Sequence, residues 1–293
     1  MSTRTSSPMD SVLAWWRLAR GNNALLAGAA SWIGAYLATG RWLHSALPGA
    51  ILAPILIAAA GNIDNDLHDR PIDTLNGLDR PLVTGAISVG AARIVRIALL
   101  LLGLGAACAC GWRSALIAMT VVVVLVLYNR RLSGIPVFGN VAVALTGSAS
   151  IVYGAVCTVP TDPSDWIAPG WGALAAFWLH LPREILKDAL DVAGDAVSGR
   201  RTLATAYGRA PAIRVAALLM SVAAVIVLII GLGPWFGPLY LFGVIVTIIP
   251  ALLLGAAQCW FNPSEDGASR WSAGLKLCML AGLAWLALGR LNP

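Results

Sequence analysis

Apolar and polar residues alternate in long blocks along this chain. Apolar runs of about 20 residues, the length that a helix needs to cross the hydrocarbon core of a bilayer, recur over almost the whole sequence. The pattern predicts an all-α fold, a polytopic membrane bundle of about nine transmembrane helices. The predicted helices cover residues 22–39, 45–61, 91–110, 114–128, 135–158, 166–183, 211–231, 236–256 and 271–289.

Polar stretches are short, with two exceptions that cover residues 62–90 and 184–210. No inter-domain linker divides the chain, so we interpret residues 1–293 as a single integral-membrane domain and residues 1–14 as a disordered leader. Because the turns are too short for a separate soluble catalytic domain, any chemistry is expected at the mouth of the bundle.

Composition agrees with a membrane location. With 58% hydrophobic and 12% charged residues and a mean hydropathy of +0.78, the chain is too apolar for an ordinary soluble domain. A net charge of +6 could indicate nucleic acid, but no basic patch with interleaved aromatic residues is present. We expect the lipid bilayer as a partner, no nucleic acid and no obligate protein partner.

The basic residues predict the orientation. If the amino terminus is cytoplasmic, three of the 20 Arg and Lys residues, Arg41, Arg113 and Arg290, fall on the outer side. The other seventeen fall on or near the cytoplasmic side, as the positive-inside rule requires. The sequence therefore predicts a multi-pass protein of the cell membrane whose two long polar stretches, and with them the active site, face the cytoplasm.

Each long polar stretch carries three aspartates at positions i, i+3 and i+7. The first triplet is Asp66, Asp69 and Asp73, and it recurs 122 residues later as Asp188, Asp191 and Asp195. This spacing places each triplet on one face of a helix. A basic turn follows each triplet, at Arg80 and at Arg201. The two stretches are interpreted as a duplicated helix-plus-loop unit, with two helix ends that face each other across a cavity.

Clustered carboxylates repel one another unless a cation lies between them. Mg²⁺ binds about six oxygen ligands, usually one or two carboxylates with water and substrate phosphate, so two facing triplets could hold Mg²⁺ ions against one diphosphate. A single triplet could be a solvated helix end, but two with identical spacing favour a metal site. A cation-coupled transporter is an alternative, although its sites would lie near the midplane. The D-G-x-x-A-R core of a cytidine-diphosphate-alcohol phosphotransferase is absent.

Residues 65–73, with the pattern N-D-x-x-D-x-x-x-D and DRPLVTG after it, resemble the first aspartate motif of the UbiA-type intramembrane prenyltransferases. Residues 183–208, REILKDALDVAGDAVSGRRTLATAYG, resemble the second. The opening REILKD with D-x-x-G-D is most similar to the digeranylgeranylglyceryl phosphate synthase branch, which makes the second ether bond of archaeal-type lipids. Residues 127–147 resemble a third pattern of that branch, and an R-x-x-N at Arg20 and Asn23 extends the resemblance toward the start.

The resemblance implies a bundle whose cytoplasmic mouth binds Mg²⁺ and a prenyl diphosphate. A prenyl group, expected to be geranylgeranyl, would pass to the hydroxyl of a phosphoglycerol ether lipid precursor with release of diphosphate. An aromatic or chlorophyll-type acceptor is the alternative. Asp69 and Asp191 are the expected catalytic residues. The implied metal ligands are Asn65, Asp66, Asp69, Asp73, Asp188, Asp191 and Asp195. The implied substrate contacts are Arg20, Asn23, Arg80, Arg130, Arg131, Lys187 and Arg201.

One position departs from the branch. Ser133 stands where the branch has a lysine, and Arg130 and Arg131 lie just before it. Either these arginines supply the missing charge or they are ordinary cytoplasmic anchors, and the sequence leaves both open.

Overall fold

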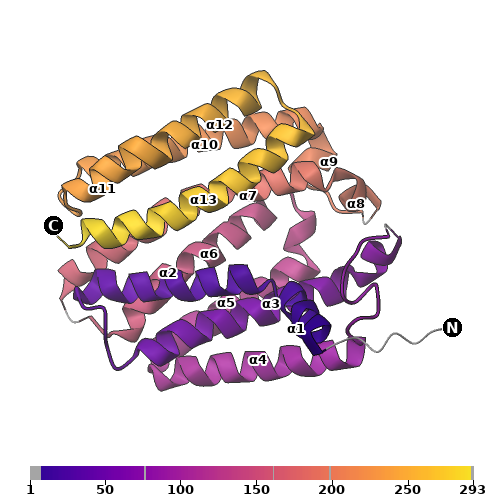
Figure 1. Cartoon of the computed structure of the whole chain (residues 1–293), viewed down its shortest axis with the longest axis horizontal. Helices are drawn as coiled ribbons and strands as arrows, with labels where there is room; N and C mark the ends of the chain where they lie inside the picture. The colour runs from indigo at the N-terminus through magenta and orange to yellow at the C-terminus, as the bar shows by residue number, and fades with distance from the viewer. Residues whose placement is uncertain (1–7, 76, 161, 198, 292–293) are drawn as a thin grey trace.

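The computed structural model describes residues 8–75, 77–160, 162–197 and 199–291, and over these residues it contains helices and no strand (Figure 1). The helices are α1 (Pro8–Leu18), α2 (Gly21–Thr39), α3 (Leu47–Leu75), α4 (Val89–Ala109), α5 (Trp112–Arg130), α6 (Phe138–Cys157), α7 (Ile167–Leu190), α8 (Val192–Val197), α9 (Leu203–Tyr207), α10 (Arg209–Leu232), α11 (Pro238–Gly243), α12 (Ile249–Phe261) and α13 (Glu265–Gly289). Short 3₁₀ turns cover Leu132–Gly134 and Pro163–Trp166, and the π-helical segment Val244–Ile248 joins α11 to α12.

Seven of the helical segments are long and apolar enough to cross a membrane, counted over the described residues. They are α3, α4, α5, α6, α10, the continuous segment Pro238–Phe261, and α13. The two other predicted spans coincide with α2 and α7. These two helices are less apolar because they carry polar residues, such as Asn23 and Glu184, that line the central cavity. A multi-pass helical bundle is thus present, and the count of nine crossings stays a prediction.

The leader is partly helical, which corrects the prediction of disorder over residues 1–14. Residues 8–14 form the first part of α1, and residues 1–7 lie outside the described residues. Ala14 and Leu18 are buried in a small core with Ile63 of α3 and Leu82 of the following loop. Burial of these apolar side chains stabilises the helix against the segment that carries the first aspartate triplet.

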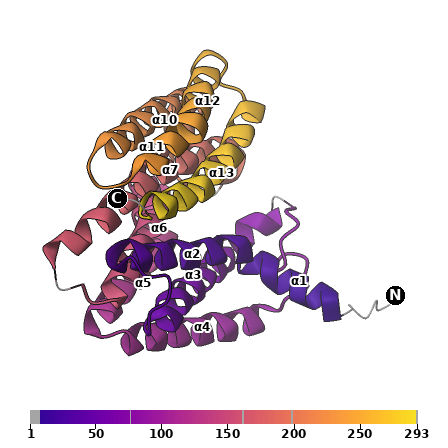
Figure 2. The same cartoon turned by 60° about the vertical axis from the view of Figure 1, so that its left-hand side comes forward.

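The long helices form a bundle in which α6 and α7 lie between two groups. In both views α10 and α12 lie on one side, and α4 and α5 lie on the other (Figures 1 and 2). The centre is closely packed because α2 and α6 meet through small residues. A Cβ on Gly34 would lie 1.9 Å from the Ile151 carbonyl oxygen, and one on Gly154 would lie 1.7 Å from the Ser31 carbonyl oxygen. Only glycine permits this approach.

Candidate active site

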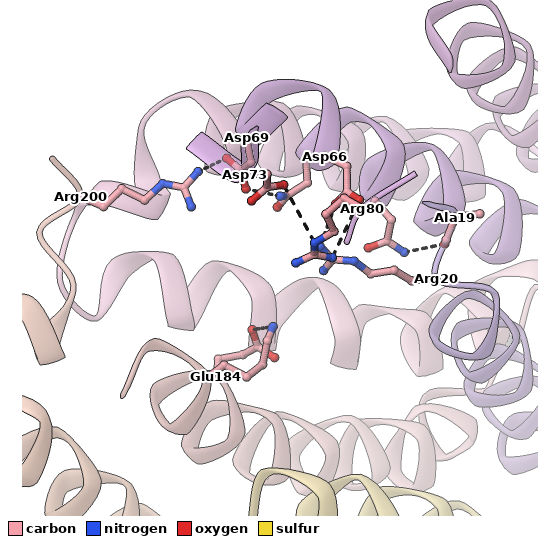
Figure 3. A network of polar contacts seen from close by, with 11 residues as sticks. Ala19, Arg20, Asp66, Asp69, Asp73, Arg80, Glu184 and Arg200 are labelled. Atoms are coloured by element: carbon pink, nitrogen blue, oxygen red, sulfur yellow. Dashed lines mark hydrogen bonds and ion pairs between the residues drawn. The ribbon is translucent and has the colours of Figure 1, made fainter. Parts of the chain in front are cut away.

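The first aspartate triplet lies where the sequence predicts it, along one face of the last turns of α3. The side chains of Asp66 and Asp73 are buried, and Asp69 is partly exposed. Figure 3 shows the three carboxylates in a row, with guanidinium groups directed at them from other segments. Burial of three carboxylates on one helix face requires cationic partners, because the charges otherwise repel one another.

Two arginines supply part of that charge. Arg20 Nη2 lies 3.0 Å from Asp66 Oδ1. Arg80 Nη1 lies 3.9 Å from Asp66 Oδ2, and its Nε lies 4.0 Å from Asp73 Oδ2. Arg20 stands between α1 and α2 with a φ of 49°, a left-handed conformation that costs a non-glycine residue about 1–2 kcal/mol. The ion pair with Asp66 offsets this strain and fixes the chain at the mouth of the bundle.

Arg200 joins the two aspartate regions. It donates a hydrogen bond from Nη2 to Asp69 Oδ1, and its Nη1 lies 3.8 Å from Asp195 Oδ1. Asn65 Nδ2 donates to the other oxygen of Asp69 over 2.6 Å. One guanidinium therefore lies between a carboxylate of the first motif and a carboxylate of the second, although 131 residues separate Arg200 from Asp69.

The sequence predicted Arg201 as a substrate contact and did not predict the adjacent Arg200. Arg201 is exposed and forms no hydrogen bond or ion pair with the part of the chain that the structure describes. The loop after α8 turns Arg200 toward the site instead, and the Thr205 hydroxyl holds that backbone by donating to the Arg200 carbonyl oxygen over 2.9 Å. Two adjacent arginines in a loop carry no periodicity that would distinguish them.

The second triplet does not share one helix face, which corrects the expectation from its spacing. Helix α7 ends at Leu190, and Asp191 is its C-cap with φ −93° and ψ 14°. Asp195 belongs to the short helix α8. Val192 and Gly194 favour the helix less than Ala or Leu would, and this is consistent with the interruption at Asp191.

The three acids of the second triplet have different environments. Asp188, in the last turn of α7, accepts a hydrogen bond of 2.7 Å from Asn140 Nδ2 of α6. Asp191 is exposed. Asp195 is buried, and this burial raises the pKa of its carboxyl to about 6, against the opposite effect of the Arg200 charge.

Basic residues also lie on α7, on the side of the site opposite the α3 carboxylates. Buried Glu184 accepts from Lys187 Nζ over 2.7 Å and from Arg183 Nη1 over 2.9 Å. Figure 3 shows Glu184 on a helix that faces the aspartate row. Asn23, on α2, accepts a hydrogen bond from Lys276 of α13. Of these residues, the sequence identified Asn23 and Lys187 as substrate contacts and did not assign a role to Arg183, Glu184 or Lys276.

A cavity of about 260 Å³ leads from these polar groups into the bundle. Asn65, Arg20 and Lys187 line its polar end beside the aspartates. Most of the other lining residues, which come from α2, α3, α5, α6, α7 and α13, are apolar. A site of this kind has the chemistry for a ligand with a charged head and a long apolar chain.

Arg130 and Arg131 lie outside this arrangement. Both side chains are exposed, and neither forms a hydrogen bond or an ion pair within the described residues. Arg130 lines a separate cavity of about 160 Å³, together with Asp64 and Arg96. The turn that carries Ser133 instead lies near Arg200, whose Cα would be 3.9 Å from a Cβ on Gly134.

The donor set can be compared with the needs of a metal ion. Over the described residues, no three His, Cys, Asp or Glu side chains converge on one point that could hold a metal. In this arrangement arginines neutralise the carboxylates. The available donors are carboxylate and amide oxygens, the ligands that Mg²⁺ prefers. Asp69 and Asp195 already lie on either side of one cation, so the residues fit a metal that takes the place of the Arg200 guanidinium.

Comparisons with known proteins identify the family. Residues 27–285 match the UbiA prenyltransferase family. The chain is 36% identical over 282 residues to the digeranylgeranylglyceryl phosphate synthase of Methanoculleus marisnigri, covering 95% of this chain and 98% of the relative. It is 35% identical over 285 residues to the synthase of the same name from Methanopyrus kandleri, covering 94% and 98%.

Solved structures share the fold. One, from work on digeranylgeranylglyceryl phosphate synthase in membranes, has a TM-score of 0.75 at 24% identity and covers 96% of this chain and 99% of its own. A UbiA homologue from Archaeoglobus fulgidus bound to GPP and Mg²⁺ has a TM-score of 0.64 at 22% identity and covers 93% and 99%. The family match and the identity over nearly the full length lead to one conclusion: this chain belongs to the UbiA prenyltransferase family.

Proposed function

We propose that this protein transfers a geranylgeranyl group from its diphosphate to the hydroxyl of a phosphoglycerol ether lipid and releases diphosphate. The observation that carries the proposal is the identity of about a third, over nearly the full length, to digeranylgeranylglyceryl phosphate synthases. The geometry supports it, because both aspartate motifs meet at Arg200, beside the polar end of a long apolar cavity.

Mg²⁺ is the proposed cofactor. Its ligands would come from Asn65, Asp66, Asp69, Asp73, Asp188, Asp191 and Asp195, and the donor set is consistent with the Mg²⁺ bound in the Archaeoglobus fulgidus homologue. When bound, the ion neutralises the phosphate oxygens and makes diphosphate a better leaving group. Asp69 and Asp191 are the acids whose loss we expect to affect turnover most.

The basic residues bind and orient the diphosphate. Arg20, Arg80 and Arg200 are held at the mouth by carboxylates, so their guanidinium groups are positioned before the substrate arrives. Arginine can bind two phosphate oxygens at once, whereas the Lys187 ammonium acts as a point charge. Arg200 thereby replaces Arg201 in the set.

The apolar cavity holds the prenyl chain and excludes water. Loss of diphosphate leaves an allylic cation at C1 of the chain. Water near that carbon would hydrolyse it, so the apolar wall protects the cation until the acceptor hydroxyl attacks C1 and passes its proton to a carboxylate of the site or to the released diphosphate.

We also propose that the bundle crosses the membrane nine times and that the site faces the cytoplasm. The distribution of Arg and Lys supports this orientation. Single cysteines introduced at Asp79 and Tyr207, both exposed, should react with a membrane-impermeant reagent only from the cytoplasmic side. Labelling of either position from the outer side alone would overturn the proposed topology.

The direct test is a product assay. Purified protein is incubated with Mg²⁺, geranylgeranyl diphosphate and a panel of acceptors, and the products are identified by mass spectrometry. We expect prenylation of geranylgeranylglyceryl phosphate, loss of activity with a chelator, and recovery with Mg²⁺ or Mn²⁺ but not with Zn²⁺. Transfer to an aromatic acceptor alone would contradict the proposed acceptor, and full turnover in excess chelator would contradict the role of the metal.

A further inference from the structure

Three polar side chains reach the cavity from three helices other than α3, the helix of the first aspartate triplet. They are Arg183 of α7, Lys276 of α13 and Asn23 of α2, and all three line the cavity. Lys276 Nζ donates to Asn23 Oδ1 over 2.8 Å and forms no ion pair with a carboxylate of the described residues. The ammonium group thus has a neutral partner inside a largely apolar bundle.

Arg183 also lacks a full set of hydrogen-bond partners. Its Nη1 binds Glu184, but its Nε is buried and has no hydrogen-bond partner among the described residues. Burial of an unsatisfied donor costs about 1–3 kcal/mol.

The local charge balance points to an anion. Arg183, Lys187 and Lys276 bring three positive charges to this part of the cavity, and Glu184 supplies one negative charge. Excess charge in apolar surroundings is unfavourable unless it is paired. The group therefore has a net positive charge, shared between the donor diphosphate at Lys187 and a second anion at Arg183 and Lys276.

This cluster is distinct from the place where the aspartates would bind diphosphate. Arg183 precedes Asp191 by eight residues on α7, so the helical rise separates them by about 12 Å along the axis. Lys276 and Asn23 lie on α13 and α2, which carry neither aspartate motif, so they can hold a second anion beside the diphosphate. The acceptor of the proposed reaction carries its phosphate one glycerol carbon away from the hydroxyl that attacks.

We propose that Arg183, Lys276 and Asn23 bind the phosphate group of the acceptor and so select a phosphorylated glycerol lipid. Glu184 positions Arg183, while Lys187 stays available to the donor diphosphate. This inference rests on the proposed function and adds to it the residues that recognise the acceptor.

The test measures acceptor preference. Wild-type protein and Lys276→Gln are assayed with geranylgeranylglyceryl phosphate and with the same lipid without its phosphate. Lys276→Gln should raise the KM of the phosphorylated acceptor by about 10- to 100-fold, the loss expected for one charge-assisted hydrogen bond. It should lower the preference for the phosphorylated lipid by a similar factor and leave the KM of geranylgeranyl diphosphate within about twofold.

Further variants separate this role from a structural one. Lys276→Arg should recover most of the preference, because it restores the charge. Asn23→Asp should weaken the preference without removing the cation, because the new carboxylate pairs with Lys276. Arg270→Gln, at an exposed basic residue of the same helix, is the matched control and should behave as wild type.

The remaining outcomes would contradict either the inference or the proposed function. A raised KM for geranylgeranyl diphosphate alone would assign the cluster to the donor and overturn the inference, as would an unchanged preference in Lys276→Gln. If the wild-type protein prenylates neither of these two glycerol lipids, the proposed function itself is wrong, and the inference falls with it.

Discussion

The two aspartate regions have the same spacing and different structures. In the first, Asp66, Asp69 and Asp73 lie on one uninterrupted helix of 29 residues. In the second, the helix stops at Asp191, and Asp195 belongs to a separate helix of six residues. An identical pattern of acids therefore does not require an identical backbone. Helix propensity between the acids does not by itself decide where the helix ends, because the first helix continues through Pro71, between Asp69 and Asp73.

The regions also differ in how their charge is balanced. The first triplet is paired with Arg20, Arg80 and Arg200, from three separate segments. The second shares Arg200 with the first, Asp188 has a neutral partner in Asn140, and Asp191 is exposed. In the metal-free protein the first region is thus paired with more guanidinium groups than the second, counted over the described residues.

The largest expected effect comes from removing one acid of each region. Asp69→Ala and Asp191→Ala should each reduce kcat by about 100-fold or more, because each removes charge stabilisation by the metal that is worth several kcal/mol. The double variant should lose much less than the product of the two, since residues that act on one diphosphate are not additive. Steady-state kinetics under saturating Mg²⁺ measure all three.

The control is Asp79→Asn, an exposed acid that pairs with Arg17 outside the triplets. It should leave kcat within about twofold. If Asp191→Ala retains wild-type kcat and KM while Asp69→Ala does not, the second region holds no metal during turnover. The first region would then be catalytic and the second structural.

The first region could be predicted from sequence more fully than the second. Helical periodicity was enough to place Asp66, Asp69 and Asp73 on one face, because the helix continues through them. It failed at Asp191, where the helix ends. Arg200 and the Lys276–Asn23 pair could not be found from sequence, because the first depends on the direction of a loop and the second joins residues 253 positions apart. The roles assigned to all of these residues stay predictions.

The second prediction concerns the bridge between the regions. Arg200→Ala leaves Asp69 and Asp195 near each other without a shared cation, so the metal-free protein should be less stable and should gain more stability from Mg²⁺ than wild type does. It should also lower kcat/KM for the prenyl diphosphate by about tenfold or more, the loss expected for a charge-assisted contact. Kinetics and thermal unfolding with and without Mg²⁺ report both effects.

The comparison variant is Arg201→Ala, the adjacent arginine that the sequence favoured. It removes the same charge from an exposed position and should change kcat/KM by no more than about twofold. Equal losses of kcat/KM in the two variants would show that the net positive charge of this loop matters. The contact of Arg200 with Asp69 and Asp195 would then not matter.

The third prediction is a pH dependence to which Asp195 of the second region contributes. Burial raises the pKa of the Asp195 carboxyl to about 6, against the effect of Arg200, whereas an unfolded Asp titrates at about 3.9. The neutral carboxyl therefore stabilises the metal-free fold at low pH, and this contribution is lost as the pH rises through about 6. Mg²⁺ requires the ionised carboxylate, so its apparent affinity should fall as the pH is lowered through the same value.

Two measurements check the direction of this pH dependence. Thermal unfolding of the metal-free protein should shift downward as the pH rises through about 6, and Asp195→Asn should flatten that dependence. Asp266→Asn, at an exposed acid at the start of α13, should leave it unchanged. A wild-type protein that becomes more stable over the same rise in pH would contradict the burial of Asp195 as the cause.

The smallest expected effect separates the two loops that follow the triplets. Each loop ends in a helix N-cap: Ser88 accepts from the Ala91 amide at the start of α4, and Thr202 accepts from the Thr205 amide at the start of α9. In the second loop the Thr205 hydroxyl also accepts from the Thr202 amide and donates to the Arg200 carbonyl oxygen. Only this cap is connected to a residue of the site.

Ser88→Ala and Thr205→Val should therefore differ in their effect on catalysis. Each removes capping hydrogen bonds and should lower the free energy of unfolding by about 1 kcal/mol. Thr205→Val should in addition release the backbone of Arg200 and reduce kcat/KM for the prenyl diphosphate by a few-fold, whereas Ser88→Ala should leave it unchanged. The effect is small because the ion pair of Arg200 with Asp69 remains. If both variants have the same kcat/KM at equal loss of stability, the Asp69 carboxylate alone holds Arg200. The two loops would then differ in sequence but contribute equally to the site.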